Sequence, residues 1–276
     1  MKSRIISSIL LVTVTMAAII FGQDIGLACL IAIIGWAAQW EFYKMQEKFG
    51  LAPMKILGML CGLYIMGTSL LSPQGQSLYD IPCKTLLIST IVVISATVLS
   101  ASLTPFKTSI QSTLFGIITI PFMCSFPIVI RHFFAVKYSY IILILWMVIV
   151  TKACDIGGMF VGKYFGRRKI SPELSPQKTW EGYWGGIAAS ILSGVVLWIL
   201  LAKWLPYLRE VYIILLSGTL GAISLLGDLA ESALKRLGGI KDSGHLLPGI
   251  GGAFDFVDSL LLSLPLGIFL YATFLF

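Results

Sequence analysis

Residues 85–104, TLLISTIVVISATVLSASLT, form an unbroken stretch without a charged side chain. A helix needs roughly 20 mostly apolar residues to cross the hydrocarbon core of a bilayer. The stretch therefore predicts a membrane-spanning helix, and similar stretches recur along the chain.

Hydrophobic residues make up 57% of the 276 residues and charged residues only 12%, and the mean hydropathy is +0.92. A soluble domain carries about a quarter charged residues, so lipid must be the main solvent of this chain. The alternation of polar and apolar residues that marks barrel strands is absent. We therefore predict an all-α, polytopic transmembrane helical bundle of about nine spans, at residues 5–22, 25–40, 56–71, 85–104, 113–130, 138–151, 183–202, 211–227 and 259–276.

The basic residues predict the orientation of these spans. With nine spans, one side of the membrane collects fifteen lysines and arginines and the other collects five, namely Lys84, Arg131, Lys137, Lys203 and Arg209. Because cytoplasmic loops carry the excess of basic residues, the larger set is expected in the cytoplasm. We therefore expect a multi-pass protein of the cell membrane with a cytoplasmic N-terminus. The net charge of +7 follows from these loops and does not indicate nucleic-acid binding.

The polar chemistry is concentrated in the C-terminal half of the chain. Nine of the thirteen acidic residues lie between Asp155 and Asp258. We expect one integral membrane domain, with N-terminal transmembrane helices over 1–151 and a C-terminal catalytic region over 152–276. The catalytic region contains two cytoplasmic motif segments, 152–182 and 228–258, and the role of Asp155 in the first stays open.

Two sets of polar residues in segment 228–258 follow helical spacing. The first set consists of Asp228, Glu231, Ser232 and Lys235, and the second consists of Asp255 and Asp258, three positions apart. Residues spaced this way share one face of a helix. Both sets lie next to apolar blocks, where ionisable side chains are costly and usually functional.

Converging carboxylates would make an oxygen-rich cation site, which suits Mg²⁺ together with substrate phosphates. The neighbouring cations Lys235, Arg236 and Lys241 could bind phosphate oxygens. Gly251 and Gly252 leave backbone N–H groups that could approach a phosphate, although a tight turn explains them equally well. This mixture predicts a metal–nucleotide site more than an ion pathway.

Three ordered stretches resemble the phosphatidate cytidylyltransferase family, also called CDP-diacylglycerol synthases. The longest runs from Ser232-x-x-Lys235-Arg236 through Lys241-Asp242 to Pro248-Gly-x-Gly251-Gly252-x-x-Asp255-x-x-Asp258. The other two are Ser175-Pro176-x-Lys178-Thr179-x-Glu181-Gly182 and Gly227-Asp228-Leu229-x-Glu231-Ser232. The resemblance is specific across 152–260 and only compositional across 1–150.

The resemblance implies that CTP and phosphatidic acid are converted to CDP-diacylglycerol and pyrophosphate, as a step of phospholipid biosynthesis. It implies Mg²⁺ as cofactor, with a second cation as a further candidate, and Asp228, Asp255 and Asp258 as metal ligands. Those three and Lys235 are the expected catalytic residues. The residues expected to bind substrate are Lys178, Ser232, Arg236, Lys241, Gly251 and Gly252.

Two positions depart from the family pattern. Ile250 stands where the family usually has a histidine, and Phe256 stands where it usually has an arginine. Both changes remove a potential phosphate donor, whereas the carboxylates and the Lys-Arg pair that carry the reaction type remain.

Two alternatives stay open at this point. Carboxylates in the membrane would also suit a cation-coupled transporter, although such a protein should carry polar groups in several helices and repeated halves. A CTP-dependent relative could instead act on another lipid phosphate. The sequence gives no acyl-chain preference and no lipid entry route, and it leaves a homodimer open.

Overall fold

The computed structural model of the chain describes residues 2–72, 78–99, 106–134, 137–173, 175–204, 209–237, 239, 243–244 and 251–275. The described elements are helices, apart from one two-stranded antiparallel hairpin. The all-α class is therefore confirmed. The chain divides into two compact units: Met1–Ala135 with Leu237–Val257, and Val136–Arg236 with Asp258–Phe276.

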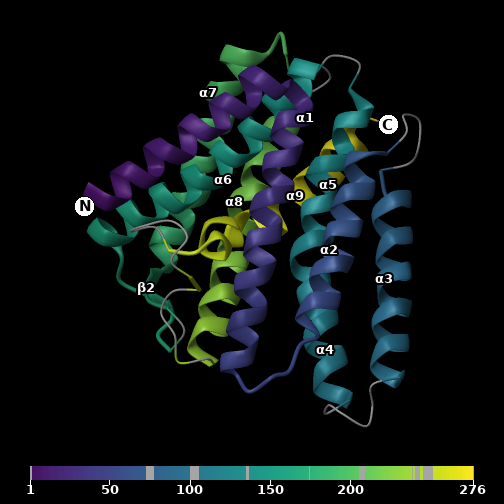
Figure 1. The fold of residues 1–276 in the computed structure, drawn as a ribbon. Coiled ribbons are helices and arrows are strands. Elements are labelled where there is room, and N and C mark those ends of the chain that lie inside the picture. The colour runs from purple at the N-terminus through teal and green to yellow at the C-terminus, as the bar shows by residue number, and fades with distance from the viewer. Residues whose placement is uncertain are drawn as a thin grey trace. The chain divides into compact units, whose positions relative to one another are not determined.

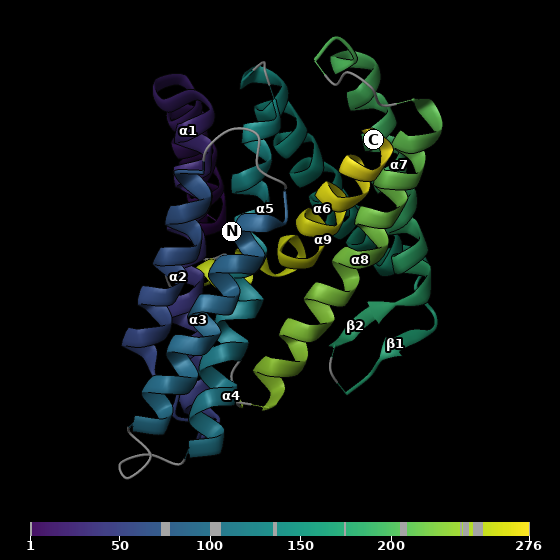
Figure 2. The same ribbon diagram turned by 90° about the vertical axis from the view of Figure 1, so that its right-hand side faces the viewer.

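The first unit contains α1 (Lys2–Lys48), α2 (Lys55–Leu70), α3 (Asp80–Leu99), α4 (Phe106–Ile117), a π-helical turn (Ile118–Phe122), α5 (Met123–Val129) and a 3-10 turn (Ile130–Phe133). The second contains α6 (Lys137–Phe165), β1 (Lys169–Ser171), β2 (Ser175–Thr179), α7 (Trp180–Leu201), most of α8 (Glu210–Leu237) and most of α9 (Ala253–Leu275). In the first unit α2, α3 and α4 run side by side (Figure 1). In the second, the hairpin connects α6 to α7 (Figure 2).

Six of the described helices are long and apolar enough to cross a membrane, at Ile9–Lys48, Ser109–Phe133, Tyr138–Phe165, Trp180–Leu201, Glu210–Leu237 and Ala253–Thr273. The polytopic character is thereby confirmed, whereas the count of nine spans stays a prediction. The short block 138–151 extends past Lys152 as part of α6. The predicted division at residue 151 falls inside the same helix and also stays a prediction.

The long helix α1 joins the first two apolar blocks of the sequence. Gln23 has a non-helical backbone (φ 50, ψ −131) between blocks 5–22 and 25–40, so the helix is kinked there. Asp24 lies next to the kink, with a carboxylate oxygen 3.6 Å from the Arg131 guanidinium. The kink is thus accompanied by a charge pair inside the first unit.

Hydrogen bonds between buried polar groups join the helices of the first unit. The Gln39 amide on α1 donates to the Gly58 carbonyl at 2.9 Å, and the Tyr43 hydroxyl donates to the Thr113 carbonyl at 3.0 Å. Ile65 and neighbouring apolar side chains form a buried cluster beside them. Such bonds stabilise helix association in lipid, where apolar burial alone gives little.

Glycines allow α6 and α7 to pack closely in the second unit. A Cβ atom at Gly182 would lie 2.7 Å from the Gly158 carbonyl oxygen and 3.0 Å from the Gly162 Cα, so a side chain does not fit there. Further along, the Trp146 indole donates to the Gly194 carbonyl at 3.0 Å. Small residues of this kind allow helix backbones to approach each other in membranes.

Candidate active site

The close approach of α8 and α9 brings three carboxylates together in the second unit. A Cβ atom at Gly227 would lie 2.5 Å from the Asp258 carbonyl oxygen and 3.1 Å from the Ser259 Cα. Only glycine therefore permits this contact. Asp228 and Glu231 project from α8 and Asp258 from α9, and one oxygen from each lies within 4.8 Å of the others.

Lysines lie beside every carboxylate of this cluster. Lys178 Nζ is 2.6 Å from an Asp228 oxygen, and Lys235 Nζ is 2.7 Å from a Glu231 oxygen. A third lysine, Lys152 on α6, lies 4.0 Å from the Asp258 carboxylate. The cluster is thus balanced by positive charge, as expected for carboxylates held in partly buried positions.

Lys152 also ties a fourth carboxylate to the cluster. Its Nζ is 3.6 Å from the Asp155 carboxylate and donates to the Ser259 hydroxyl at 2.8 Å. The Ser259 hydroxyl in turn donates to the Asp155 carboxylate at 3.4 Å. Asp155, whose role the sequence left open, therefore belongs to the same polar site as Asp258.

The donor set of the cluster suits a divalent cation. Mg²⁺ favours hard oxygen ligands and binds through carboxylates together with phosphates. Asp228, Glu231 and Asp258 supply three carboxylates that converge from two helices, and they could hold such an ion. The lysines beside them could then neutralise the phosphates of a substrate.

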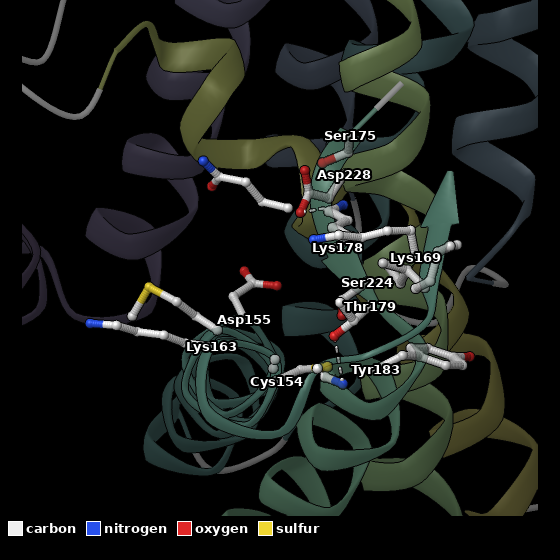
Figure 3. Close-up of a pocket in the computed structure, with 18 residues that line it drawn as sticks. Cys154, Asp155, Lys163, Lys169, Ser175, Lys178, Thr179, Tyr183, Ser224 and Asp228 are labelled. Carbon is white, nitrogen blue, oxygen red and sulfur yellow. Dashed lines mark hydrogen bonds and ion pairs between the residues drawn. The ribbon is translucent and has the colours of Figure 1, made fainter. Parts of the chain in front are cut away.

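A cavity of about 680 Å³ opens beside this cluster (Figure 3). Its lining includes Gly158 and Gly162 of α6, Gly182 of α7, and the polar side chains of Asp155, Lys163, Lys169, Lys178 and Asp228. Met159 and Leu225 add apolar surface. A cavity lined by glycines and by several lysines suits a ligand that carries phosphates.

The hairpin β1–β2 sets the position of Lys178. β2 ends at Thr179, whose hydroxyl accepts the Gly182 N–H at 3.2 Å and so caps the first turn of α7. The Glu181 carboxylate accepts the backbone N–H groups of Arg167 at 2.9 Å and Arg168 at 3.1 Å, at the other side of the hairpin. Lys178 is therefore held between a sheet pair and a helix cap.

Asp255 has a different environment, which residues of the first unit form. Its carboxylate accepts the Gly252 N–H at 2.7 Å and the Ser243 N–H at 3.2 Å. The first of these bonds caps the start of α9. Asp258 lies one helical turn later on the same helix, where the chain passes into the second unit.

The structure brings together several of the predicted site residues. Asp228, Asp258, Lys178 and Lys235 all belong to the cluster of carboxylates and lysines. Ser232 is half-buried on α8, and Arg236 is exposed near its end. Gly251 has a positive φ of 126°, which favours glycine at this turn. Lys241 and Ile250 lie outside the described residues.

Two members of the cluster were not singled out from the sequence as site residues. Glu231 lies on the predicted polar face of α8 and within the quoted Gly227–Ser232 stretch, which was the available signal. Lys152 gave a weaker signal, three residues before Asp155. Its role depends on the contact between α6 and α9, which spacing along the chain does not reveal.

In one unit of this multi-pass helical protein, carboxylates and lysines lie beside a glycine-lined cavity. This arrangement suits a membrane enzyme that acts on phosphate groups. Comparison with known sequences narrows this class. The chain belongs to the cytidylyltransferase family, whose sequence model matches residues 2–274. This result does not favour the transporter alternative.

Curated relatives agree with the family assignment. A phosphatidate cytidylyltransferase of Bacillus subtilis (strain 168) is 32% identical over 280 residues, covering 99% of this chain and 98% of the relative. The enzyme of the same name from Haemophilus influenzae is 38% identical over 143 residues, which are 51% of this chain and 50% of the relative. That of Synechocystis sp. is 47% identical over 115 residues, 41% of this chain and 38% of the relative.

Proposed function

We propose that the chain is a membrane-bound nucleotidyltransferase that makes CDP-diacylglycerol and pyrophosphate from CTP and phosphatidic acid in phospholipid biosynthesis. The relative from Bacillus subtilis, which matches almost end to end, carries the name of this activity. The structural observation that supports it most is the Asp228–Glu231–Asp258 cluster, joined by the Lys178 ion pair to a cavity. A reaction between a lipid phosphate and a nucleotide needs access to the membrane for the lipid and a phosphate-binding site for both substrates.

The reaction needs no protein nucleophile. A phosphate oxygen of phosphatidic acid attacks the α-phosphorus of CTP, so that a new P–O bond forms. The bond from the α-phosphorus to the bridging oxygen of the β-phosphate breaks, and pyrophosphate leaves with the electron pair. Catalysis then consists of aligning two phosphates and neutralising charge that accumulates on them.

The residues divide this work between them. Asp228, Glu231 and Asp258 would hold Mg²⁺, and Asp255 remains a proposed ligand from the sequence resemblance. When bound, Mg²⁺ would supply positive charge to the phosphate oxygens of CTP. Lys178, at the cavity, would bind a phosphate oxygen in place of its present partner Asp228. The other proposed substrate contacts are Ser232, Lys235, Arg236, Lys241, Gly251 and Gly252.

We infer that the site faces the cytoplasm of a cell-membrane protein. The support is the excess of fifteen lysines and arginines over five on the side that carries both motif segments. CTP is then available at the site directly, and phosphatidic acid reaches it from the bilayer.

The purified protein should be tested with labelled CTP against several lipid phosphates, including phosphatidic acid and a polyprenyl phosphate. We expect a cytidylyl lipid from phosphatidic acid only when Mg²⁺ is present. Glu210→Gln, an exposed carboxylate at the start of α8, serves as the matched control for Asp258→Asn. A preference for the polyprenyl phosphate would replace the proposed lipid, and equal activity in Asp258→Asn and the control would remove this residue from the site.

A further inference from the structure

One buried carboxylate of the first unit lies outside the site described above. Glu41 is in the second half of α1 and is 9% exposed. An ionisable group in an apolar helix is costly unless it is hydrogen-bonded or has a function. No motif in the sequence points to it, because it directly follows apolar block 25–40 and lies far from both motif segments.

Glu41 meets the start of α9, which lies 213 positions further along the chain. Its Oε2 atom accepts the Phe254 backbone N–H at 3.0 Å and lies 3.4 Å from the Ser243 hydroxyl, which donates to it. The first N–H groups of a helix have no partner within the helix. Glu41 therefore caps α9 from a distant helix of the same unit.

The surrounding glycines fit the Glu41 carboxylate closely. A Cβ atom at Gly244 would collide with one carboxylate oxygen of Glu41, and a Cβ atom at Gly252 would collide with the other. The aromatic ring of the next residue, Phe42, packs on Phe254 with centroids 5.1 Å apart. Two successive residues of α1 thus hold the same turn of α9.

Ser243 links Glu41 to Asp255. The Ser243 hydroxyl donates to Glu41, and the Ser243 N–H donates to the Asp255 carboxylate at 3.2 Å. Asp255 also accepts the Gly252 N–H at 2.7 Å. Both carboxylates thus accept hydrogen bonds from Ser243 and from the start of α9, so Glu41 helps to hold the backbone around Asp255.

We propose that Glu41 is a positioning residue for the reaction: it fixes the first turn of α9, and through that turn it orients the helix carrying Asp255 and Asp258. This inference rests on the proposed function and extends the site to the N-terminal half of the chain. Glu41 itself touches no substrate. It acts by holding the backbone that carries the Asp255 carboxylate, at the start of the helix that continues to Asp258.

The test compares Glu41→Ala, Glu41→Asp and Glu41→Gln in the purified full-length chain. Alanine removes the acceptor and aspartate shortens it by one methylene, whereas glutamine keeps an oxygen that can accept the Phe254 N–H. We expect kcat to fall about tenfold or more in the first two, with the half-saturating Mg²⁺ concentration raised, and KM for CTP nearly unchanged. Glutamine should restore most of kcat. Glu47→Ala, an exposed carboxylate on the same helix, is the control.

A second readout does not depend on turnover. Hydrogen–deuterium exchange of the peptide covering residues 251–256 should be faster in Glu41→Ala than in the wild type and in Glu47→Ala. Unchanged exchange would overturn the inference, even if the wild type made no CDP-diacylglycerol and the proposed function itself failed. If Glu41→Ala shows faster exchange but unchanged kcat and Mg²⁺ dependence, Glu41 fixes the first turn of α9 without affecting the reaction, and its role as a positioning residue is overturned. If Glu41→Ala does not fold, hydrogen–deuterium exchange of the same peptide is compared between Glu41→Asp and Glu41→Gln, and we expect faster exchange in Glu41→Asp.

Discussion

Replacing Glu231 with glutamine tests whether the cluster on α8 and α9 holds the cation. Glu231 is 5% exposed, and its carboxylate lies within 4.8 Å of those of Asp228 and Asp258. Glutamine keeps the shape of the side chain and removes its negative charge. The change also removes the ion pair with Lys235, in which the two charged atoms are 2.7 Å apart.

The size of the effect separates two roles for Glu231. A contact to a charged group contributes about 1.5–3 kcal/mol, so losing a metal ligand should raise the half-saturating Mg²⁺ concentration about 10- to 150-fold. If Glu231 served only as the partner of Lys235, the loss would appear as lower thermal stability, because breaking a buried pair costs about 3–5 kcal/mol of folding free energy. The half-saturating Mg²⁺ concentration would then stay within about twofold of the wild type.

The assay is a Mg²⁺ titration of CTP turnover, together with Mn²⁺ binding measured in the absence of CTP. Glu210→Gln controls for the loss of a carboxylate on α8 outside the cluster. The same titration on Asp255→Asn decides whether the ligand expected from the resemblance contributes as well. An unchanged Mg²⁺ dependence in Glu231→Gln, alongside a large shift in Asp258→Asn, would refute the assignment of Glu231.

Three further predictions follow from the site and from its orientation. Lys178→Met should raise KM for CTP or phosphatidic acid about tenfold or more in steady-state kinetics, because the cavity loses a phosphate-binding cation. An unchanged KM for both substrates would exclude this role. Gly182→Ala should lower the free energy of unfolding by about 1–3 kcal/mol, because the new methyl group would meet the Gly158 carbonyl. Unfolding curves of the protein in detergent measure this change, and an unchanged free energy would contradict the close packing. In sealed vesicles of known orientation, CTP added only to the cytoplasmic face should support product formation, and activity only from the opposite face would reverse the predicted topology.

Local patterns in the sequence pointed to several residues that the structure brings together. The helical spacing of Asp228 and Glu231 placed both on one face of α8, as the structure has them. The apolar blocks predicted the helices, and the kink at Gln23 falls between the first two blocks. Such features depend on neighbours within a few residues, which a sequence shows directly.

Contacts between distant helices could not be predicted in the same way. Lys152 reaches Ser259 because α6 passes α9, and Glu41 reaches Phe254 across 213 positions. The β1–β2 hairpin was not predicted, for a different reason. Ser175-Pro176 locally indicates a turn, whereas in the structure β2 begins at Ser175. The extended conformation of this segment is stabilised by its pairing with β1. A single sequence contains no record of such tertiary partners.

The fate of each CTP phosphate tests the proposed reaction most directly. The purified protein should be incubated with phosphatidic acid, Mg²⁺ and CTP labelled at either the α- or the γ-phosphate, and the lipid and aqueous phases counted separately. We predict that the α-label moves into the lipid as CDP-diacylglycerol and that the γ-label appears in an equal amount of pyrophosphate. Transfer of the γ-label to the lipid, or release of pyrophosphate without a cytidylyl lipid, would contradict the assignment of the chain as a phosphatidate cytidylyltransferase.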